Sequence, residues 1–291
     1  MMLPAKKRKQ TETAPRWILH AITAVTIIAG GVMGFGGAWV HAEETEPEPE
    51  PGIEIPLDTE EYEEDFNIRR GEHNTIVPDP VNGQRRVLRV GIPAGSHYGA
   101  SMRVLMAETF GEEPEEATAR YWLYVPHDFA FHERYGGGKL PGFTGRYGEA
   151  GWGGRRADGT YGWSARMGFE PPREDAHRDV SLAFYTYHAG MGQWGDTDRW
   201  EAGMSKGEWR QIDQYVRMNT PGEHDGVQRG WVDGELVFER DDLLFREAGY
   251  EHLRIEDLYF NIYYGGSWSS PVDTAFYFRD LKIWPGKKVT P

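Results

Sequence analysis

The chain has 291 residues and a net charge of −14, with 37 glycines, 11 tryptophans and no cysteine. The absence of cysteine excludes a disulfide framework, a zinc–thiolate site and a thiol nucleophile. Glycine and tryptophan at these levels favour a loop-rich β-protein and argue against a long helical bundle.

The first 42 residues are expected to direct export. Residues 1–16 are basic, and residues 17–40 form an uncharged, mostly apolar stretch, which is typical of a signal peptide. Ala42, a small residue directly before Glu43, would suit cleavage by a signal peptidase between the two. The stretch is also long enough to span a bilayer, so a membrane tether through residues 17–40 is the alternative. In both cases we expect the rest of the chain to be secreted, periplasmic or at the cell surface.

Residues 43–66 are expected to be an extended acidic spacer. They carry twelve acidic residues and no basic residue, and glutamate alternates with proline from Glu46 to Pro51. Such a segment repels itself and buries little apolar surface. Residues 67–291 carry the remaining net charge of −6. This charge argues against sequence-independent nucleic-acid binding but allows an anionic ligand at a locally basic site.

Residues 67–291 are expected to form one all-β domain. Short alternating segments separated by Gly, Pro, Asn and Asp predict strands, and no convincing amphipathic helix lies between them. The predicted strands cover 86–92, 101–107, 119–125, 162–169, 180–188, 209–219, 230–237, 255–264 and 274–283. About nine strands joined by turns predict a sandwich of two packed antiparallel sheets.

Two of these strands place polar side chains on the face opposite an apolar set. Period-two alternation puts Ser164 and Arg166 together in one strand, and Tyr185 and Tyr187 together in another. A pair of tyrosines on a polar face is either an ordinary part of a sheet surface or part of a site.

A basic, glycine-rich run covers residues 134–166, with a net charge of +4 in an acidic chain. Its segment Gly136–Gly142 has the glycines of a phosphate loop but not the spacing, which excludes a nucleotide site of that type. We expect Lys139 to be held by the Leu-Pro-Gly turn that follows it. A lysine fixed beside several arginines suits an anionic polymer.

The segment Gly137–Gly142 resembles polysaccharide lyase family 14, whose members are alginate and glucuronate-polymer lyases with a β-jelly-roll fold. Further segments resemble the family in the same order, within residues 118–284: Ser164-x-Arg166, Tyr185-x-Tyr187, Gln214–Gly222 with Asp225-Gly226, Trp231–Gly234 and Tyr264-Gly265-Gly266. Residues 67–117 match less clearly, and residues 170–179 look longer than the corresponding connection. The resemblance implies a jelly-roll sandwich.

The resemblance also implies site residues. The family's catalytic lysine corresponds to Lys139, its Ser-x-Arg pair to Ser164 and Arg166, and its two tyrosines to Tyr185 and Tyr187. Further candidates for substrate binding are Gln214, Arg217 and Tyr264. Gln214 and Arg217 fall on opposite faces of their strand, so we expect one of them to reach the substrate groove.

β-Elimination at a uronate explains why these residue types would be needed. The reaction removes the proton on C5, places charge on the carboxylate and expels the 4-linked oxygen, so it requires a cation, a base and an acid. Arg166 suits the carboxylate because a guanidinium binds it bidentately, with Ser164 adding a hydrogen bond. We expect Tyr187 to transfer a proton together with Lys139, with Tyr185 as its partner. The sequence does not determine which side chain is the base.

Two other functions fit parts of the sequence. A glycoside hydrolase would need two carboxylates flanking the bond, and no strand with the Glu-x-Asp-x-x-Glu pattern occurs. A carbohydrate-binding module would use exposed aromatic platforms, for which the candidates are Trp152, Trp194, Trp200 and Trp268. The ten histidines show no compact ligand spacing, so we expect no metal and no cofactor. We expect a monomer that binds an anionic polysaccharide.

Overall fold

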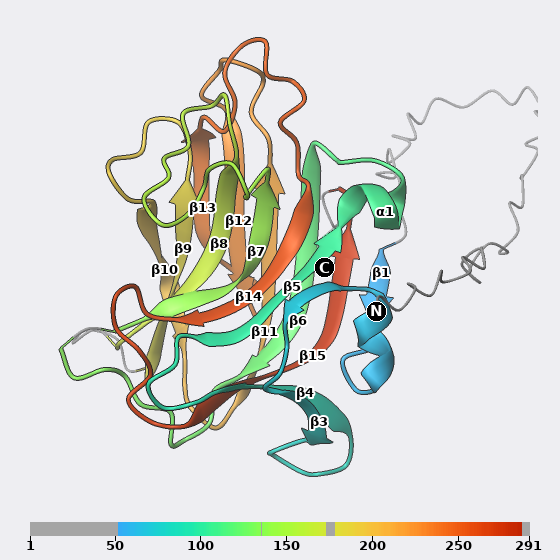
Figure 1. Ribbon diagram of the computed structural model, residues 1–291, viewed down its shortest axis with the longest axis vertical. Helices are drawn as coiled ribbons and strands as arrows, with labels where there is room; N and C mark the ends of the chain where they lie inside the picture. The colour runs from blue at the N-terminus through green and yellow to red at the C-terminus, as the bar shows by residue number, and fades with distance from the viewer. Residues whose placement is uncertain (1–51, 135, 173–177, 287–291) are drawn as a thin grey trace, which may run out of the picture. The chain divides into compact units, whose positions relative to one another are not determined.

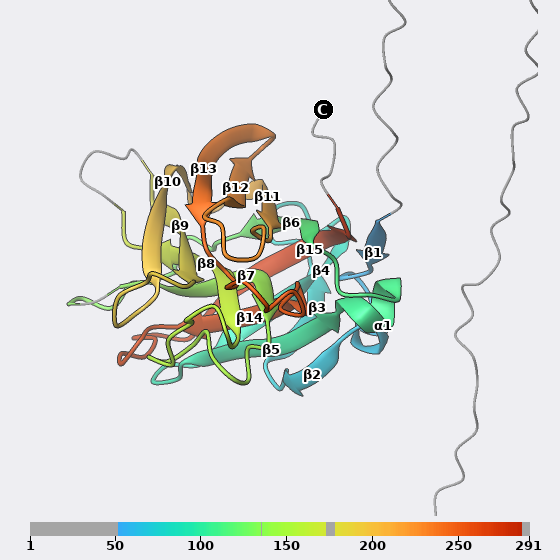
Figure 2. The ribbon, with the colours of Figure 1, turned by 90° about the horizontal axis from the view of Figure 1, so that it is seen from above.

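The computed structural model describes residues 52–134, 136–172 and 178–286, and these form a sandwich of two antiparallel sheets (Figure 1). Viewed from above, the two sheets lie as two layers with the core between them (Figure 2). The predicted all-β jelly-roll sandwich is confirmed, and its described part contains fifteen strands.

We call the two layers sheet A and sheet B. Sheet A has the order β13 (Glu235–Leu243), β12 (Gly226–Val232), β11 (Trp209–Arg217), β6 (Glu116–Tyr124), β15 (Thr274–Trp284), β4 (Arg86–Ile92) and β3 (Asn74–Pro78), with β1 (Ile53–Ile55) also paired to β15. Sheet B has the order β10 (Asp196–Met204), β9 (Val180–Tyr187), β8 (Trp163–Glu170), β7 (Gly138–Gly145), β14 (Asp257–Tyr264), β5 (Tyr98–Leu105) and β2 (Asn67–Arg70). A 3₁₀ helix, η1 (Glu60–Glu64), and a short helix, α1 (Met106–Phe110), complete the described elements.

The core follows the alternation of the strands. In β8, Trp163, Met167 and Phe169 are buried between the sheets, and in β9 the same is true of Leu182 and Phe184. The residues between them therefore point to the outer face of sheet B, as predicted.

Strand β7 differs from the prediction, because Lys139 lies in a strand and not beside a turn. The pairing of β7 with β8 and with β14 shifts register after Lys139, so Leu140 and Pro141 form a bulge. Proline lacks the N–H that a central strand needs, and a bulge is a position where a sheet accepts it. Hydrogen bonding from strands on both sides overrides the turn propensity of this glycine-rich segment.

One predicted strand boundary was wrong, and one strand of sheet B was not predicted. Residues 230–237 were expected to be one strand, but β12 and β13 meet there in a hairpin whose turn residues are Asp233 and Gly234, with φ of 53° and 86°. Positive φ at both positions is the geometry of a tight hairpin turn, which favours Asp-Gly. Strand β10 was not predicted, because its charged residues obscure the alternation of a sheet edge.

The chain N-terminal to residue 67 also takes part in the fold. Residues 43–66 were expected to be a spacer, yet β1 pairs with β15, and Ile55, Leu57 and Tyr62 are buried in the core. These apolar side chains alternate with acids that remain exposed, so the segment buries one face despite its charge.

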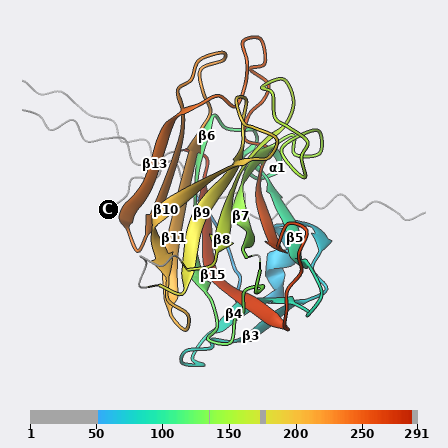
Figure 3. The same cartoon turned by 90° about the vertical axis from the view of Figure 1, so that its left-hand side faces the viewer.

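Sheet A and sheet B are joined by ion pairs at one edge. There β10 of sheet B lies beside β13 of sheet A (Figure 3). The Arg240 guanidinium of β13 lies 3.2 Å from Asp196 and 2.9 Å from Asp198 of β10. This edge is therefore closed by charge pairing across the two layers.

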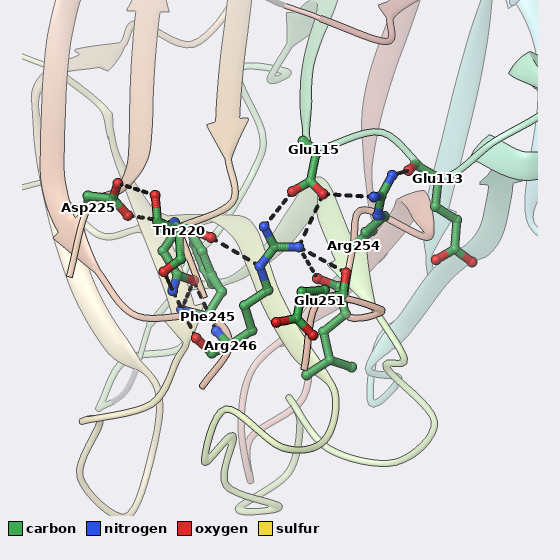
Figure 4. Close-up of polar contacts among 10 residues, drawn as sticks. Glu113, Glu115, Thr220, Asp225, Phe245, Arg246, Glu251 and Arg254 are labelled. Carbon is green, nitrogen blue, oxygen red and sulfur yellow. Dashed lines mark hydrogen bonds and ion pairs between the residues drawn. The ribbon is translucent and has the colours of Figure 1, made fainter. Parts of the chain in front are cut away.

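A buried arginine, Arg246, joins three connecting segments between the strands (Figure 4). Arg246 donates to the Glu115 carboxylate and to the main-chain oxygens of Asn219, Glu251 and Leu253 (Figure 4). The Asn219 side chain in turn bonds the main chain of Arg246. The arrangement satisfies a buried charge and several carbonyl groups together.

The predicted export segment lies outside the described residues. Within the described residues, no helix combines the length and the apolar character required for crossing a membrane.

Candidate active site

The predicted catalytic residues, and Arg166, which is predicted to bind the substrate, lie on the outer face of sheet B, which is the face turned away from the core. Lys139 comes from β7, Arg166 from β8, and Tyr185 and Tyr187 from β9. The three strands are hydrogen-bonded neighbours, so the sheet brings these side chains together from three separate parts of the chain.

The Lys139 ammonium lies 4.5 Å from the centre of the Tyr185 ring and donates to the Gly265 carbonyl at 3.2 Å. Burial lowers the pKa of Lys139 to about 8, the positive charge of Arg166 acts in the same direction, and the Glu170 carboxylate opposes both. A fraction of the amine is therefore neutral near neutral pH, and a neutral amine can accept a proton.

The bulge after Lys139 is supported from the other sheet. Gln214 of β11 is fully buried between the sheets, and its amide nitrogen donates to the Pro141 carbonyl at 3.0 Å. At Gly142 a Cβ atom would lie 2.4 Å from the Ala165 carbonyl oxygen, so glycine is needed where β7 passes β8. Gln214 thus holds the strand that carries Lys139 and does not reach the outer face.

Arg166 is 5% exposed and donates from Nη1 to the Asn261 amide oxygen at 2.6 Å. Its guanidinium carbon lies 5.2 Å from the Tyr147 ring centre and 5.8 Å from that of Tyr259. Its Nε–H is buried with no hydrogen-bond partner in the described part of the chain. Neither Arg166 nor Lys139 forms an ion pair with a carboxylate among the described residues.

The two tyrosine hydroxyls lie 3.4 Å apart, and the rings meet edge to face with centres 5.5 Å apart. Tyr187 is buried, and its hydroxyl accepts a hydrogen bond from the Gly154 N–H at 3.3 Å. Tyr185 is more exposed and lies against Lys139. Burial, followed by the hydrogen bond with Tyr187, raises the pKa of Tyr185, so this phenol stays protonated at neutral pH.

Three other predicted residues do not lie where a substrate would contact them. Ser164 is fully buried, and its hydroxyl donates to the Gly151 carbonyl at 2.8 Å, which anchors the β7–β8 loop. Arg217 is exposed on sheet A and donates to the Asp225 carbonyl. Tyr264 is buried in the core, where its hydroxyl donates to Ala130. Its neighbour Tyr263 faces outward instead.

Sequence reasoning missed four residues on or over this face. Alternation in β14 places Leu258, Phe260, Ile262 and Tyr264 in the core and therefore Tyr259, Asn261 and Tyr263 outside, so the signal was present. Tyr147 comes from the β7–β8 loop, and no sequence pattern indicates that it contacts Arg166. Burial raises the pKa of Tyr147 to about 12.

The candidate aromatic platforms differ in exposure. Trp152 is 37% exposed and Trp194 58% exposed, and both lie in connecting loops of sheet B. Trp200 packs in the core against Phe184, with ring centres 5.1 Å apart, so it is not a surface platform. Trp268 packs partly buried against the core.

The described part of the chain places no group of three or more His, Asp or Glu side chains where they could hold a metal ion. His188 is buried, and its Nε2 lies 2.8 Å from an Asp196 carboxylate oxygen. Asp257, also on the outer face of sheet B, is buried and accepts hydrogen bonds from Thr144 and Arg103. Both Asp257 and its neighbour Glu256 are ion-paired with Arg103, so neither is a free carboxylate of the kind a hydrolase uses.

The arrangement combines Arg166 and Lys139, neither of which forms an ion pair with a carboxylate of the described residues, with a phenol that keeps its proton, and the lysine has a lowered pKa. Such a set suits an anionic ligand from which a proton is removed and to which another is returned.

Several solved structures share this fold. A variant of the alginate lyase Aly36B, in complex with an alginate trisaccharide, is 21% identical with a TM-score of 0.65, covering 80% of this chain and 97% of that one. An alginate lyase of the marine Aplysia kurodai is 20% identical with a TM-score of 0.58, covering 76% and 88%. An endo-β-1,4-glucuronan lyase of the fungus Trichoderma reesei is 13% identical with a TM-score of 0.50, covering 75% and 89%.

A comparison with curated protein sequences gave no match. The family model of polysaccharide lyase 14 matches residues 80–281, which is more than half of the chain and includes Lys139, Arg166 and both tyrosines. The chain therefore belongs to polysaccharide lyase family 14.

Proposed function

We propose that the chain is an exported lyase that cleaves a uronic-acid polymer, alginate or glucuronan, by β-elimination. The observation that carries the proposal is the juxtaposition of Lys139 and Arg166 on one sheet face without a carboxylate partner among the described residues. Two nearby positive charges repel each other, and an anion bound between them offsets this repulsion. A uronate carboxylate supplies that anion.

Arg166 binds the carboxylate of the sugar that loses its proton. Its free Nε–H and its second terminal nitrogen are suited to a bidentate contact, because Asn261 occupies only Nη1. When the proton on C5 leaves, negative charge spreads onto this carboxylate. A guanidinium held in advance by Asn261 stabilises that charge without reorganising.

Lys139 is the base and Tyr185 is the acid in the proposed reaction. The neutral Lys139 amine takes the proton from C5, the electrons of that C–H bond form the C4–C5 double bond, and the C4–O bond breaks. The Tyr185 hydroxyl returns a proton to the leaving oxygen. This exchanges the roles expected for the two tyrosines, since Tyr187 is buried and bonded to Gly154, whereas Tyr185 is half-buried beside Lys139.

The names of the similar structures support the substrate class. Two are called alginate lyases and one a glucuronan lyase. Export through residues 1–42 fits such a substrate, because these polymers lie outside the cytoplasm of a cell that degrades them.

The test is to incubate the purified chain with alginate, polymannuronate and glucuronan and to follow the ultraviolet absorbance of the unsaturated uronate product. We expect a rise on at least one polymer, which Lys139→Ala abolishes. Tyr185→Phe should lower kcat about 10²- to 10⁴-fold, and more than Tyr187→Phe does, because only the acid transfers a proton to the substrate. A greater loss in Tyr187→Phe would return the role of acid to Tyr187.

The competing function is a carbohydrate-binding module, which the exposure of Trp152 and Trp194 favours. Binding of a uronate polymer without any unsaturated product would contradict the lyase proposal and support the module. Replacing both tryptophans by alanine should then abolish binding, whereas Lys139→Ala should leave most of it.

A further inference from the structure

A row of outward-facing side chains continues from Lys139 across sheet B to its far edge. Tyr263 of β14 is paired in register both with Lys139 of β7 and with Tyr98 of β5. On β2, the edge strand, the Arg70 guanidinium lies 4.0 Å from the centre of the Tyr98 ring. Lys139, Tyr263 and Tyr98 therefore form a row across the strands, and Arg70, whose backbone pairs with Ser101, reaches the end of this row with its side chain.

The aromatic members of the row are held in place and remain accessible. Tyr98 is 38% exposed, and its ring meets Tyr263 edge to face with centres 5.1 Å apart. His97 stacks on Tyr263, with ring centres 5.3 Å apart and planes 11° apart, and its ring centre also lies 6.3 Å from that of Tyr98, so the three rings form one cluster. The Tyr263 hydroxyl donates to the Gly266 carbonyl at 3.2 Å. A fixed ring loses little conformational entropy when a sugar packs against it.

Arg70 is exposed and forms no ion pair with a carboxylate in the described residues. Glu72, two residues further on, accepts a hydrogen bond from the Gly71 N–H at 3.2 Å. The contact with Tyr98 orients the Arg70 guanidinium by a cation–π interaction and leaves its N–H groups available. A guanidinium oriented in this way is suited to a planar carboxylate.

We propose that Arg70, Tyr98 and Tyr263 form an additional binding subsite for one carboxylated sugar unit of the polymer. The inference rests on the proposed function and deepens it. Neighbouring strands lie about 4.8 Å apart, so β2 lies about 14 Å from β7 across the sheet. Arg70 binds the carboxylate of a unit several sugars away from the one that loses its proton, and Tyr98 packs against the sugar ring.

The subsite depends on a part of the chain outside the family match. Arg70 precedes residues 80–281, whereas Tyr98 and Tyr263 lie within them. Strand β2 thus adds the charged end of the row to a face that the matched region provides, and it favours long substrates over short ones.

The experiment measures chain-length dependence in Arg70→Ala, with Arg69→Ala as the matched control. Arg69 is also exposed and lies on the same strand, so both variants lose one positive charge. We measure kcat/KM on a uronate octasaccharide and a trisaccharide, and the affinity of the same oligosaccharides for each variant combined with Lys139→Ala. Arg70→Lys tests whether charge alone is sufficient.

We expect Arg70→Ala to weaken octasaccharide binding and to raise its KM about 5- to 10-fold, as befits one charge-assisted contact at an exposed site. The trisaccharide should be affected less than twofold, kcat should be unchanged, and Arg70→Lys should recover part of the loss. Arg69→Ala should behave as the parent protein does.

Other outcomes would overturn the subsite. If Arg69→Ala and Arg70→Ala lose octasaccharide affinity equally, then the positive charges of this strand only attract the anionic polymer in general and Arg70 forms no specific contact. An unchanged octasaccharide affinity in Arg70→Ala, while the parent protein still cleaves the polymer, would refute the subsite and leave the lyase proposal intact. A parent protein that neither binds nor cleaves any uronate would refute both.

Discussion

The pKa of Lys139 gives the proposed reaction a pH dependence of definite sign. Because burial and Arg166 lower this pKa to about 8, the fraction of Lys139 in the neutral form increases as the pH rises through that value. We expect kcat/KM to increase up to about pH 8 and then to level off. Lys139→Arg should remove the activity at every pH, since a guanidinium does not lose its proton.

The measurement is a pH–rate profile of kcat/KM. A profile that falls as the pH rises through about 8 would mean that the protonated lysine is required, and Tyr185 would then be the candidate for the base.

The lowered pKa of Lys139 should also make the stability of the fold depend on pH. The folded pKa lies below the unfolded value of about 10.4, so the charged lysine destabilises the fold below pH 8, and this penalty disappears as the pH rises toward 10.4. Lys139→Met should therefore raise the melting temperature more at pH 7 than at pH 10.

Residue positions were predictable from the sequence where alternation was regular. Arg166 and Tyr185 lie on the outer face of sheet B as their strands require, and Tyr187 lies on the same face of β9 by alternation although it is buried against the core. Tyr264 was assigned from its motif, although the alternation of β14 places Tyr263 and not Tyr264 on the outer face. The burial of Ser164 was not predictable, because it depends on a loop that covers it.

At the scale of elements, strand β7 shows that hydrogen bonding to neighbouring strands can override the turn propensity of a segment. Its glycines and proline predict a turn, and the strand exists because β8 and β14 bond to it from both sides. The bulge at Leu140 and Pro141 determines where Lys139 points. We therefore expect a contact that holds this bulge to affect the proposed reaction without touching the substrate.

We expect Gln214→Leu to be such a positioning variant. It removes the donor to the buried Pro141 carbonyl, which should cost about 1–3 kcal/mol of stability. It should also lower kcat more than it changes KM, because a displaced lysine reacts slowly while Arg166 still binds the carboxylate. Thermal melts and steady-state kinetics provide the two readouts.

The control for this variant is Gln211→Leu, on the same strand but on its outer side, where the glutamine donates to Asp213. It should leave kcat unchanged. If Gln214→Leu loses stability but keeps full kcat, then the glutamine supports the fold alone and does not position Lys139.

At the scale of the whole molecule, the part of the chain before residue 67 is needed for a stable sandwich. Ile55, Leu57, Tyr62 and Phe66 are buried in the core, and β1 extends sheet A. A fragment that begins at residue 67 should therefore melt at a lower temperature than one that begins at Glu43. Each fully buried apolar side chain adds about 1.5–3 kcal/mol to the free energy of unfolding, relative to the same side chain left exposed.

Calorimetry of the two fragments checks this prediction. Equal melting temperatures would mean that residues 43–66 are a spacer throughout, as the acidic composition first indicated. That composition was misleading because charge averages over a segment hide one buried face, and only the tertiary contact with β15 shows which side chains are covered.

The pairing of β15 with β1, β4 and β6 has a consequence for the order of events during folding. Ile53 meets Ile283, and Arg89 meets Tyr277, so strands from the beginning of the fold pair with residues synthesised near its end. Such high contact order makes folding slow, on the order of milliseconds to seconds for small all-β proteins. Until β15 emerges from the ribosome, sheet A lacks the strand that joins its two halves. The sandwich therefore cannot close during synthesis until nearly the whole of the described chain has been made.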